Sequence, residues 1–265
     1  MKNNVNKLWY ATERHIPVLG HRGICAQYPE NTLVSFESAI RLGVDLIEFD
    51  VNVTKDGELV IIHDNDIART SNGEGLVRSY TLKELKTFDF ASKFKGWKQK
   101  EEIPTLRELL TMVNNMTKDI CLNVEIKDMT EEAVDKTLAT LQEFDILDRC
   151  VIACFDANIL RYTHKKYPDV HLQGFPGCYM EHFTEDVYDM MFGMGIPIHW
   201  NDVIGNEDKI KGYVRLAKSH GILPWLFCAD TPKDVERCVR YGCANVTGNN
   251  PAVALETLRK MNLHK

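Results

Sequence analysis

The chain has 265 residues, of which 44% are hydrophobic and 26% charged, and its net charge is −6 at pH 7. This composition is typical of a folded globular protein and excludes a disordered one. The acidic balance and the lack of a lysine or arginine run argue against nucleic acid as a partner. The length allows a large hydrophobic core without disulfide bonds.

The cysteines and the N-terminal segment bear on cellular location. The eight cysteines form no C-x-x-C pair, so neither a zinc site nor a redox motif is indicated. Residues 1–15 are polar and lack the apolar core of a signal peptide. Because no run of about 18 apolar residues is present, we expect no membrane span. A reduced, cytoplasmic protein is the simplest interpretation.

Short apolar segments alternate along the chain with segments of helical period. The predicted strands are, in order, Pro17–His21, Leu46–Val51, Cys121–Ile126, Cys150–Phe155, His171–Phe175, Ile196–Trp200, Leu223–Phe227 and Ala244–Thr247. The predicted helices are Asn31–Leu42, Thr105–Asn114, Thr130–Phe144, Ala157–Lys166, Thr184–Phe192, Glu207–Ser219, Pro232–Tyr241 and Pro251–Met261. Eight such repeats predict a (β/α)8 TIM barrel, and a doubly wound open sheet is the alternative.

One connection is much longer than a barrel unit requires. Between Val51 and Ile120 the chain contains a turn signal at residues 54–57 and a further strand at Leu59–Ile62. We therefore expect a small inserted subdomain at about residues 52–118, after the second strand. Residues 1–265 as a whole are expected to form a single barrel domain.

Polar residues with catalytic potential stand at the ends of the first three predicted strands. They are His21 and Arg22 on the first, Glu48 and Asp50 on the second, and Glu125 and Lys127 on the third, with His63 in the insertion. Residues two apart share one face of a strand, so the two members of each carboxylate-containing pair point the same way. Because barrel chemistry gathers at the carboxyl ends of the strands, we expect these seven residues to meet at one site.

The three carboxylates predict a site for one hard divalent cation. Glu48, Asp50 and Glu125 offer only oxygen ligands, which favours Mg²⁺ or Ca²⁺ without choosing between them. A bare carboxylate on the inward face of an apolar strand also requires a partner. Arg22 and Lys127 are expected to bind an anion, most plausibly a phosphate. The alternative for Lys127 is a purely structural ion pair with Glu125.

Eight short motifs follow one another in this chain. They are His21-Arg22-Gly23, Pro29-Glu30-Asn31-Thr32, Glu48-Phe49-Asp50-Val51, Thr54-Lys55-Asp56-Gly57, His63-Asp64, Arg69-Thr70, Ile103-Pro104-Thr105-Leu106 and Asn123-Val124-Glu125-Ile126-Lys127. In this order and register the chain resembles the glycerophosphodiester phosphodiesterase family. The resemblance spans nearly the whole chain and is densest from residue 19 to residue 127.

The resemblance implies a TIM barrel with an insertion after the second strand, and hydrolysis of a small-molecule glycerophosphodiester to glycerol 3-phosphate and an alcohol. It implies a cation on the three carboxylates, His21 and His63 as the acid–base pair, and Arg22 and Lys127 on the phosphate. The C-terminal third departs from the family. Residues 225–228 replace a Trp-Thr-Val-Asn-like stretch, residues 247–251 replace a Thr-Asp-x-Pro-like turn, and Cys154-Phe155 replaces Ser-Phe. These positions shape the alcohol pocket, so the head group stays open.

Individual roles follow from the chemistry of phosphodiester cleavage, which needs a base for the nucleophile and an acid for the leaving oxygen. We assign His21 as the base and His63 as the acid. The alternative, in which the two histidines exchange these roles, is supported almost as well by the sequence. The nucleophile is either water or a neighbouring glycerol hydroxyl, and the second would first form a cyclic phosphate. Trp225 is expected to contact the substrate, and Trp200 and Trp225 either wall the pocket or belong to the core.

Two asparagines are expected to support the site. Asn31 is interpreted as a helix cap that alternatively reaches a metal ligand, and Asn123 as support for Glu125. The remaining strand and helix histidines, His164, His171, His182, His199 and His220, are expected to be surface or structural residues.

Three functions compete at this stage. The favoured one is a metal-dependent glycerophosphodiesterase, with homo-oligomers possible. The second is a lysophospholipase D, which requires an exposed apolar groove that Phe88, Phe90, Phe94 and Trp97 would supply if they are not the small core of the insertion. The third is a barrel that only binds a phosphorylated ligand.

Overall fold

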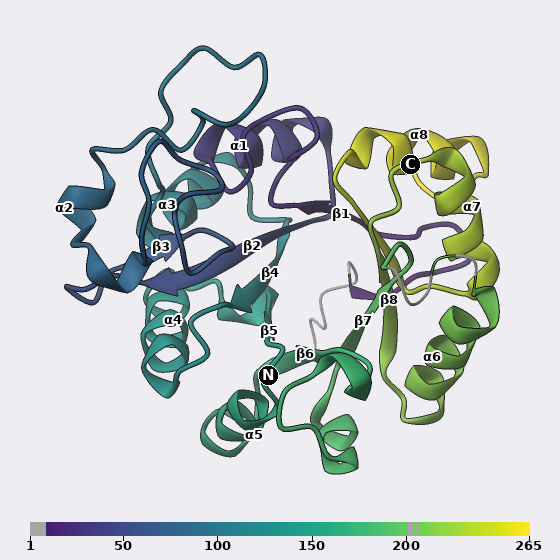
Figure 1. The fold of residues 1–265 in the computed structure, drawn as a ribbon. Coiled ribbons are helices and arrows are strands. Elements are labelled where there is room, and N and C mark those ends of the chain that lie inside the picture. The colour runs from purple at the N-terminus through teal and green to yellow at the C-terminus, as the bar shows by residue number, and fades with distance from the viewer. Residues whose placement is uncertain (1–8, 201–203, 205) are drawn as a thin grey trace.

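The computed structural model describes residues 9–200, 204 and 206–265, and it shows a closed ring of parallel strands surrounded by helices (Figure 1). The parallel strands are β1 (Val18–His21), β2 (Leu46–Val53), β4 (Cys121–Ile126), β5 (Cys150–Ala153), β6 (His171–Gly174), β7 (Gly193–Pro197), β8 (Leu223–Phe227) and β9 (Asn245–Gly248). Strand β1 pairs with both β2 and β9, which closes the ring. The predicted TIM barrel is confirmed, and the open-sheet alternative is wrong.

The helices that cover the barrel begin at polar caps. They are α1 (Leu33–Leu42), α3 (Leu106–Met116), α4 (Glu131–Glu143), α5 (Ala157–Lys166), α6 (Glu207–Ser219), α7 (Pro232–Tyr241) and α8 (Pro251–Lys260). At the start of α3, for example, Thr105 and Glu108 form a reciprocal capping box that satisfies two free backbone N–H groups. The helix predicted at residues 184–192 is instead a 3₁₀ segment, η5 (Glu185–Met190). It stops there because the Phe192 N–H already donates to Leu172 O as the chain enters β7.

Strand β7 lies three residues earlier than the predicted Ile196–Trp200. The sequence did not predict residues 193–195 as part of the strand, because glycine is unfavourable in strands and weakens the apolar strand pattern. The two glycines are needed for close packing: a Cβ on Gly193 would lie 3.1 Å from the Trp225 ring, and one on Gly195 would lie 2.6 Å from the Phe175 ring. Large side chains of neighbouring strands thus fill the space that β7 leaves.

Replacing Gly195 with alanine is expected to destabilise the fold by about 1–3 kcal/mol, because the new methyl group overlaps the Phe175 ring and Gln173 Nε2. Urea unfolding followed by circular dichroism measures the change. Gly212→Ala on α6 is the matched control, since its Cβ would meet nothing closer than 4.0 Å. A Gly195→Ala protein as stable as the control would contradict the proposed packing.

The core has two layers. The larger one lies between the strands and the outer helices and contains, among others, Phe36, Phe49 and Leu110. A second cluster, which includes Leu19, Leu46 and Trp225, fills the barrel at the amino ends of the strands. Within it the Trp9 and Trp225 rings stack with centroids 5.9 Å apart. This apolar floor leaves the opposite end of the barrel for polar residues.

The segment between β2 and α3 forms a small unit of its own beside the ring (Figure 1). Strand β3 (Leu59–Ile61) pairs antiparallel with the end of β2, and η2 (Val77–Ser79) and α2 (Leu82–Leu85) follow. The hydrophobic cluster of this unit buries Phe90, and Phe88 packs against it. These two aromatic residues are therefore core, not an exposed groove. The antiparallel return of β3 brings His63 back over the carboxyl end of β2.

Among the residues that the structure describes, no helix combines the length and the apolar character needed to cross a membrane.

Candidate active site

The predicted site residues come together at the carboxyl ends of the barrel strands. A cavity of about 340 Å³ opens there. The predicted residues that line it are His21, Arg22, Glu48, His63, Glu125, Lys127 and Trp225. Asp50 lies just below, with no exposed surface. Trp225 contributes to the floor, where it is almost completely buried.

The strand register brings the three carboxylates together. Glu48 lies opposite His21, and Asp50 lies opposite Glu125. One oxygen from each of the three carboxylates lies within 4.8 Å of the others. Glu48 Oε1 and Asp50 Oδ1 are buried and accept no hydrogen bond within the described part of the chain. Such oxygens destabilise a protein unless something binds them, and this all-oxygen set fits a hard divalent cation.

The charges around these carboxylates are unevenly balanced. Burial, together with Asp50 and Glu125, raises the pKa of Glu48 well above its usual range. Burial acts in the same direction on Asp50, but Lys127 and Arg22 outweigh it and hold the pKa of Asp50 low. Without a cation the raised pKa therefore favours the protonated form of Glu48. A bound cation would displace that proton, so its affinity should rise with pH.

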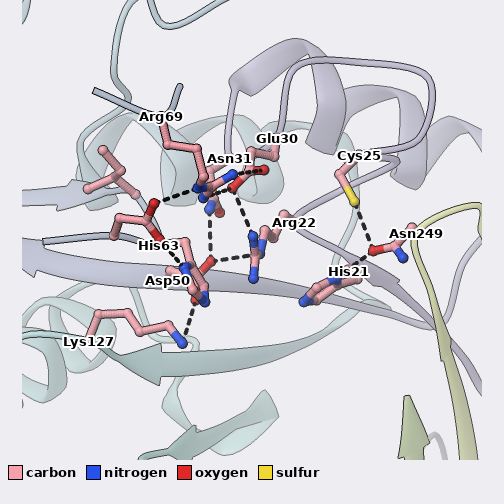
Figure 2. A network of polar contacts seen from close by, with 12 residues as sticks. His21, Arg22, Cys25, Glu30, Asn31, Asp50, His63, Arg69, Lys127 and Asn249 are labelled. Carbon is pink, nitrogen blue, oxygen red and sulfur yellow. Dashed lines mark hydrogen bonds and ion pairs between the residues drawn. The ribbon is translucent and has the colours of Figure 1, made fainter. Parts of the chain in front are cut away.

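Arg22 lines the cavity and is held by three contacts, of which Figure 2 shows those with Glu30 and Asp50. Its backbone N–H donates to Glu48 Oε2 at 2.9 Å, and its Nη1 donates to Glu30 Oε1 at 2.9 Å. Its Nε lies 3.3 Å from Asp50 Oδ2. Glu30 in turn accepts two hydrogen bonds from Arg69, each 2.8 Å long. The guanidinium is thus fixed beside the carboxylates, where an anionic ligand would meet it.

Lys127 points toward the same cluster of carboxylates. Its ammonium donates to Glu125 and lies 3.5 Å from Asp50 Oδ1. Burial lowers its pKa, but Glu125 and Asp50 more than compensate and raise the pKa to about 12, so the side chain stays charged. The ion pair with Glu125 that was considered as the alternative is present. Contact of Lys127 with a phosphate stays a prediction.

The two asparagines behave differently from expectation. Thr32, not Asn31, caps α1. The interpretation of Asn31 as a cap is wrong, and its side chain instead donates to Asp50 Oδ2 at 2.8 Å, which was the second possibility. Asn31 takes a left-handed conformation with φ 58° to do so. Asn123 donates to Gln173 Oε1 at 2.7 Å, so its amide bonds to β6, the strand beyond β5, rather than to Glu125.

The two histidines have different partners. His21 Nδ1 forms a 2.7 Å hydrogen bond with Asn249 Oδ1. Burial and Arg22 lower the pKa of His21 to about 4, so the ring is neutral near pH 7. His63 Nδ1 lies 2.5 Å from Asp64 Oδ1, and Arg69 holds the other oxygen of Asp64. One histidine thus faces a neutral amide and the other a carboxylate.

Comparison with known proteins identifies the family of this chain. The profile of the glycerophosphoryl diester phosphodiesterase family matches residues 21–253. The chain belongs to this family. A glycerophosphodiester phosphodiesterase of Caldanaerobacter subterraneus subsp. tengcongensis is 31% identical over 250 residues, which cover 92% of this chain and 98% of that protein. The predicted family and enzyme class, a phosphoric diester hydrolase acting on glycerophosphodiesters, are confirmed.

Solved structures confirm the fold of this glycerophosphodiesterase family member. A phosphodiesterase of Oleispira antarctica, in complex with the product sn-glycerol-3-phosphate, has a TM-score of 0.79 at 24% identity and covers 92% of this chain and 96% of its own. A glycerophosphoryl diester phosphodiesterase of Parabacteroides distasonis has a TM-score of 0.75 at 20% identity, with 98% and 92% covered. At these sequence identities the structural similarity shows the barrel architecture alone.

The side of the cavity away from β1 and β2 is aromatic. It is lined by Phe155, Phe175, Trp200 and Phe227, which follow or end β5 to β8. The Phe155 and Phe175 rings stack with centroids 3.5 Å apart, and the Trp200 and Phe227 rings meet edge to face at 5.6 Å. The cavity of this glycerophosphodiesterase therefore has one strongly charged side and one apolar side.

Sequence reasoning missed two residues next to the site, Asn249 and Asp230. Asn249 contacts His21 as described, and Asp230 accepts hydrogen bonds from the Asn249 side chain and backbone. The only signal for Asn249 was its place in the turn that departs from the family. Asp230 lies in a loop after β8 and carried no signal of its own.

Lowering the pH is expected to destabilise the cation-free enzyme through His21. The pKa of His21 is about 4 in the folded chain, against 6.5 for an unperturbed histidine, so the unfolded chain takes up the proton first as the pH falls. Stability from this group is therefore lost between about pH 6.5 and pH 4, by up to about 3 kcal/mol. Glu48 contributes to the pH dependence of stability with the opposite sign, since its raised pKa lets the folded chain bind more protons than the unfolded chain.

Comparison with His21→Gln isolates the histidine, because both proteins keep Glu48. In denaturant unfolding with a chelator present, the free energy of unfolding of the wild type should fall more steeply over this pH range. Parallel pH curves for the two proteins would show that His21 titrates normally.

Proposed function

We propose that this enzyme hydrolyses glycerophosphodiesters to sn-glycerol 3-phosphate and an alcohol with one divalent cation, Mg²⁺ or Ca²⁺, on Glu48, Asp50 and Glu125. The observation that carries the proposal is the set of buried carboxylate oxygens without hydrogen bonds beside two fixed cationic side chains. The product found in the Oleispira antarctica relative supports the same product here. When bound, the cation would act as a Lewis acid on the phosphate.

Arg22 and Lys127 are proposed to bind the non-bridging oxygens of the phosphate. Both stay charged and both lie within 3.5 Å of Asp50, so a phosphate that approaches the cation also meets them. Their attraction strengthens as negative charge develops during cleavage, which lowers the barrier rather than only tightening binding.

The histidines are proposed to divide the proton transfers as the sequence suggested. His21 is neutral near pH 7 and can accept a proton from the nucleophile on Nε2. The carboxylate of Asp64 lies against Nδ1 of His63 and orients the ring, and His63 is proposed to protonate the leaving alcohol. The scheme holds whether the nucleophile is water or the adjacent glycerol hydroxyl.

The aromatic side of the cavity is proposed to receive the carbon skeleton of the substrate. A cavity of about 340 Å³ is in the range of small-molecule sites. Phe88 and Phe90 belong to the core of the insertion, and Phe94 and Trp97 are half-buried, with the Trp97 ring packed against Tyr28. The exposed apolar groove needed for a lysophospholipase D is therefore not supported there. Deacylated diesters are thus the favoured substrates.

The experiment is turnover of glycerophosphocholine and glycerophosphoethanolamine by enzyme stripped with a chelator and resupplied with Mg²⁺, Ca²⁺ or Mn²⁺. Release of sn-glycerol 3-phosphate that disappears on stripping and returns with one ion is the expected result. Much faster turnover of lysophosphatidylcholine would support the lipid substrate instead. Full activity after verified removal of metal would refute the cation.

A further inference from the structure

We propose that Asn249 and Asp230 are positioning residues that hold His21 in the tautomer protonated on Nδ1, which leaves the Nε2 lone pair free toward the cavity. The inference deepens the proposed function and rests on the role of His21 as base. Figure 2 shows His21, Cys25 and Asn249 meeting at one oxygen atom.

Asp230 determines the orientation of the Asn249 amide. Its carboxylate accepts hydrogen bonds from Asn249 N at 2.6 Å, Asn250 N at 3.1 Å and Asn249 Nδ2 at 2.5 Å. A carboxylate only accepts, so the amide nitrogen of Asn249 must face Asp230. The Oδ1 atom is thereby turned away from Asp230 and toward His21. The two backbone contacts hold Asp230 itself in place.

Cys25 provides an independent indication of the same orientation. Its thiol donates to Asn249 Oδ1, with Sγ 3.1 Å away. Burial raises the pKa of this thiol to about 12, so it remains an S–H donor near pH 7. An amide NH₂ group at this position would face a donor, whereas a carbonyl oxygen accepts from it.

The tautomer of His21 follows from these contacts. Asn249 Oδ1 lies 2.7 Å from His21 Nδ1 and can only accept, so the proton of the neutral ring must be on Nδ1. Nε2 then carries a lone pair, and it points to the cavity, 3.9 Å from Glu48 Oε2. Because the partner is an amide and not a carboxylate, the ring is oriented without an added negative charge.

The test uses two variants of the full chain. In Asp230→Asn, the new amide oxygen can keep the two backbone hydrogen bonds, but its NH₂ group faces Asn249. Asn249 should then turn its oxygen to residue 230 and its NH₂ group to His21, which forces the proton onto Nε2. We expect kcat to fall by about 10²-fold or more, with little change in KM, because the base is blocked while the substrate contacts remain.

The exchange variant Asp230→Asn/Asn249→Asp restores the pattern of donors and acceptors. A carboxylate at position 249 accepts from both His21 Nδ1 and the new amide at position 230. We expect kcat to recover to within about tenfold of the wild type. Thermal unfolding would show that both variants are folded. If kcat then falls equally in the single and the exchange variant, the proposal is overturned in favour of a merely structural role.

The tautomer can also be observed without activity. In the wild type, ¹⁵N NMR of the His21 ring should show a protonated Nδ1 and an unprotonated Nε2, and Asp230→Asn should reverse the two. A wild-type ring protonated on Nε2 would refute the positioning role even if no variant folds. Full activity of His21→Ala together with the expected tautomer would instead refute the base role and leave the positioning contacts intact.

Discussion

Replacing Asp50 with asparagine is expected to lower kcat/KM by about 10²–10³-fold and to remove stabilisation by Mg²⁺ or Ca²⁺. Asp50 is completely buried and keeps its charge because Lys127 and Arg22 lie against it. An amide there leaves two cationic groups without their shared carboxylate and replaces one anionic oxygen ligand with a neutral, weaker one. Initial rates and thermal unfolding over a range of cation concentrations measure both effects.

The wild type should gain about 2.7 kcal/mol at a cation concentration 100 times its Kd, and the Asp50→Asn variant should gain far less. Asp208→Asn is the control, since that side chain is 95% exposed on α6. The Glu48→Gln variant separates the effect of losing the cation from an effect on the stability of the fold. Glutamine resembles the protonated form of Glu48 that its raised pKa favours without a cation, so activity should fall with little loss of stability. Equal cation stabilisation of wild type and Asp50→Asn would place the cation elsewhere.

Replacing His63 with alanine is expected to lower kcat for glycerophosphocholine by about 10²–10⁴-fold, because choline leaves as an alkoxide unless it is protonated. A glycerol p-nitrophenyl phosphodiester should be affected far less, since p-nitrophenolate leaves without a proton. His21→Ala should slow both substrates, because both require a base for the nucleophile. Steady-state rates of the two variants on the two substrates form the measurement.

His164→Ala serves as the matched control, since His164 is exposed on α5 and does not line the cavity. A reversed pattern, with His21→Ala rescued by the activated leaving group, would exchange the two roles. Equal losses on both substrates for His63→Ala would show that His63 does not act as the acid.

Much of the charged side of the site was readable from local sequence. Side chains alternate along a strand, so Glu48 with Asp50 and Glu125 with Lys127 were predicted to share faces from spacing alone. The parallel register then brings Asp50 opposite Glu125, as the barrel requires. Strand β7 was misplaced because its glycines are explained only by the Trp225 and Phe175 rings that pack against them, and such contacts have no local signature.

The sequence by itself determined which residue types stand at the carboxyl ends of the first strands, because strand period and apolar runs are local properties. Only the tertiary structure decided their partners. Closure of the barrel pairs β1 with β9, so Asn249 meets His21 across 228 positions of sequence. The tertiary structure likewise decided that Asn31, predicted as a helix cap, instead donates a hydrogen bond to Asp50. Hydrogen bonds of this kind depend on distances between distant segments, which spacing along one chain does not encode.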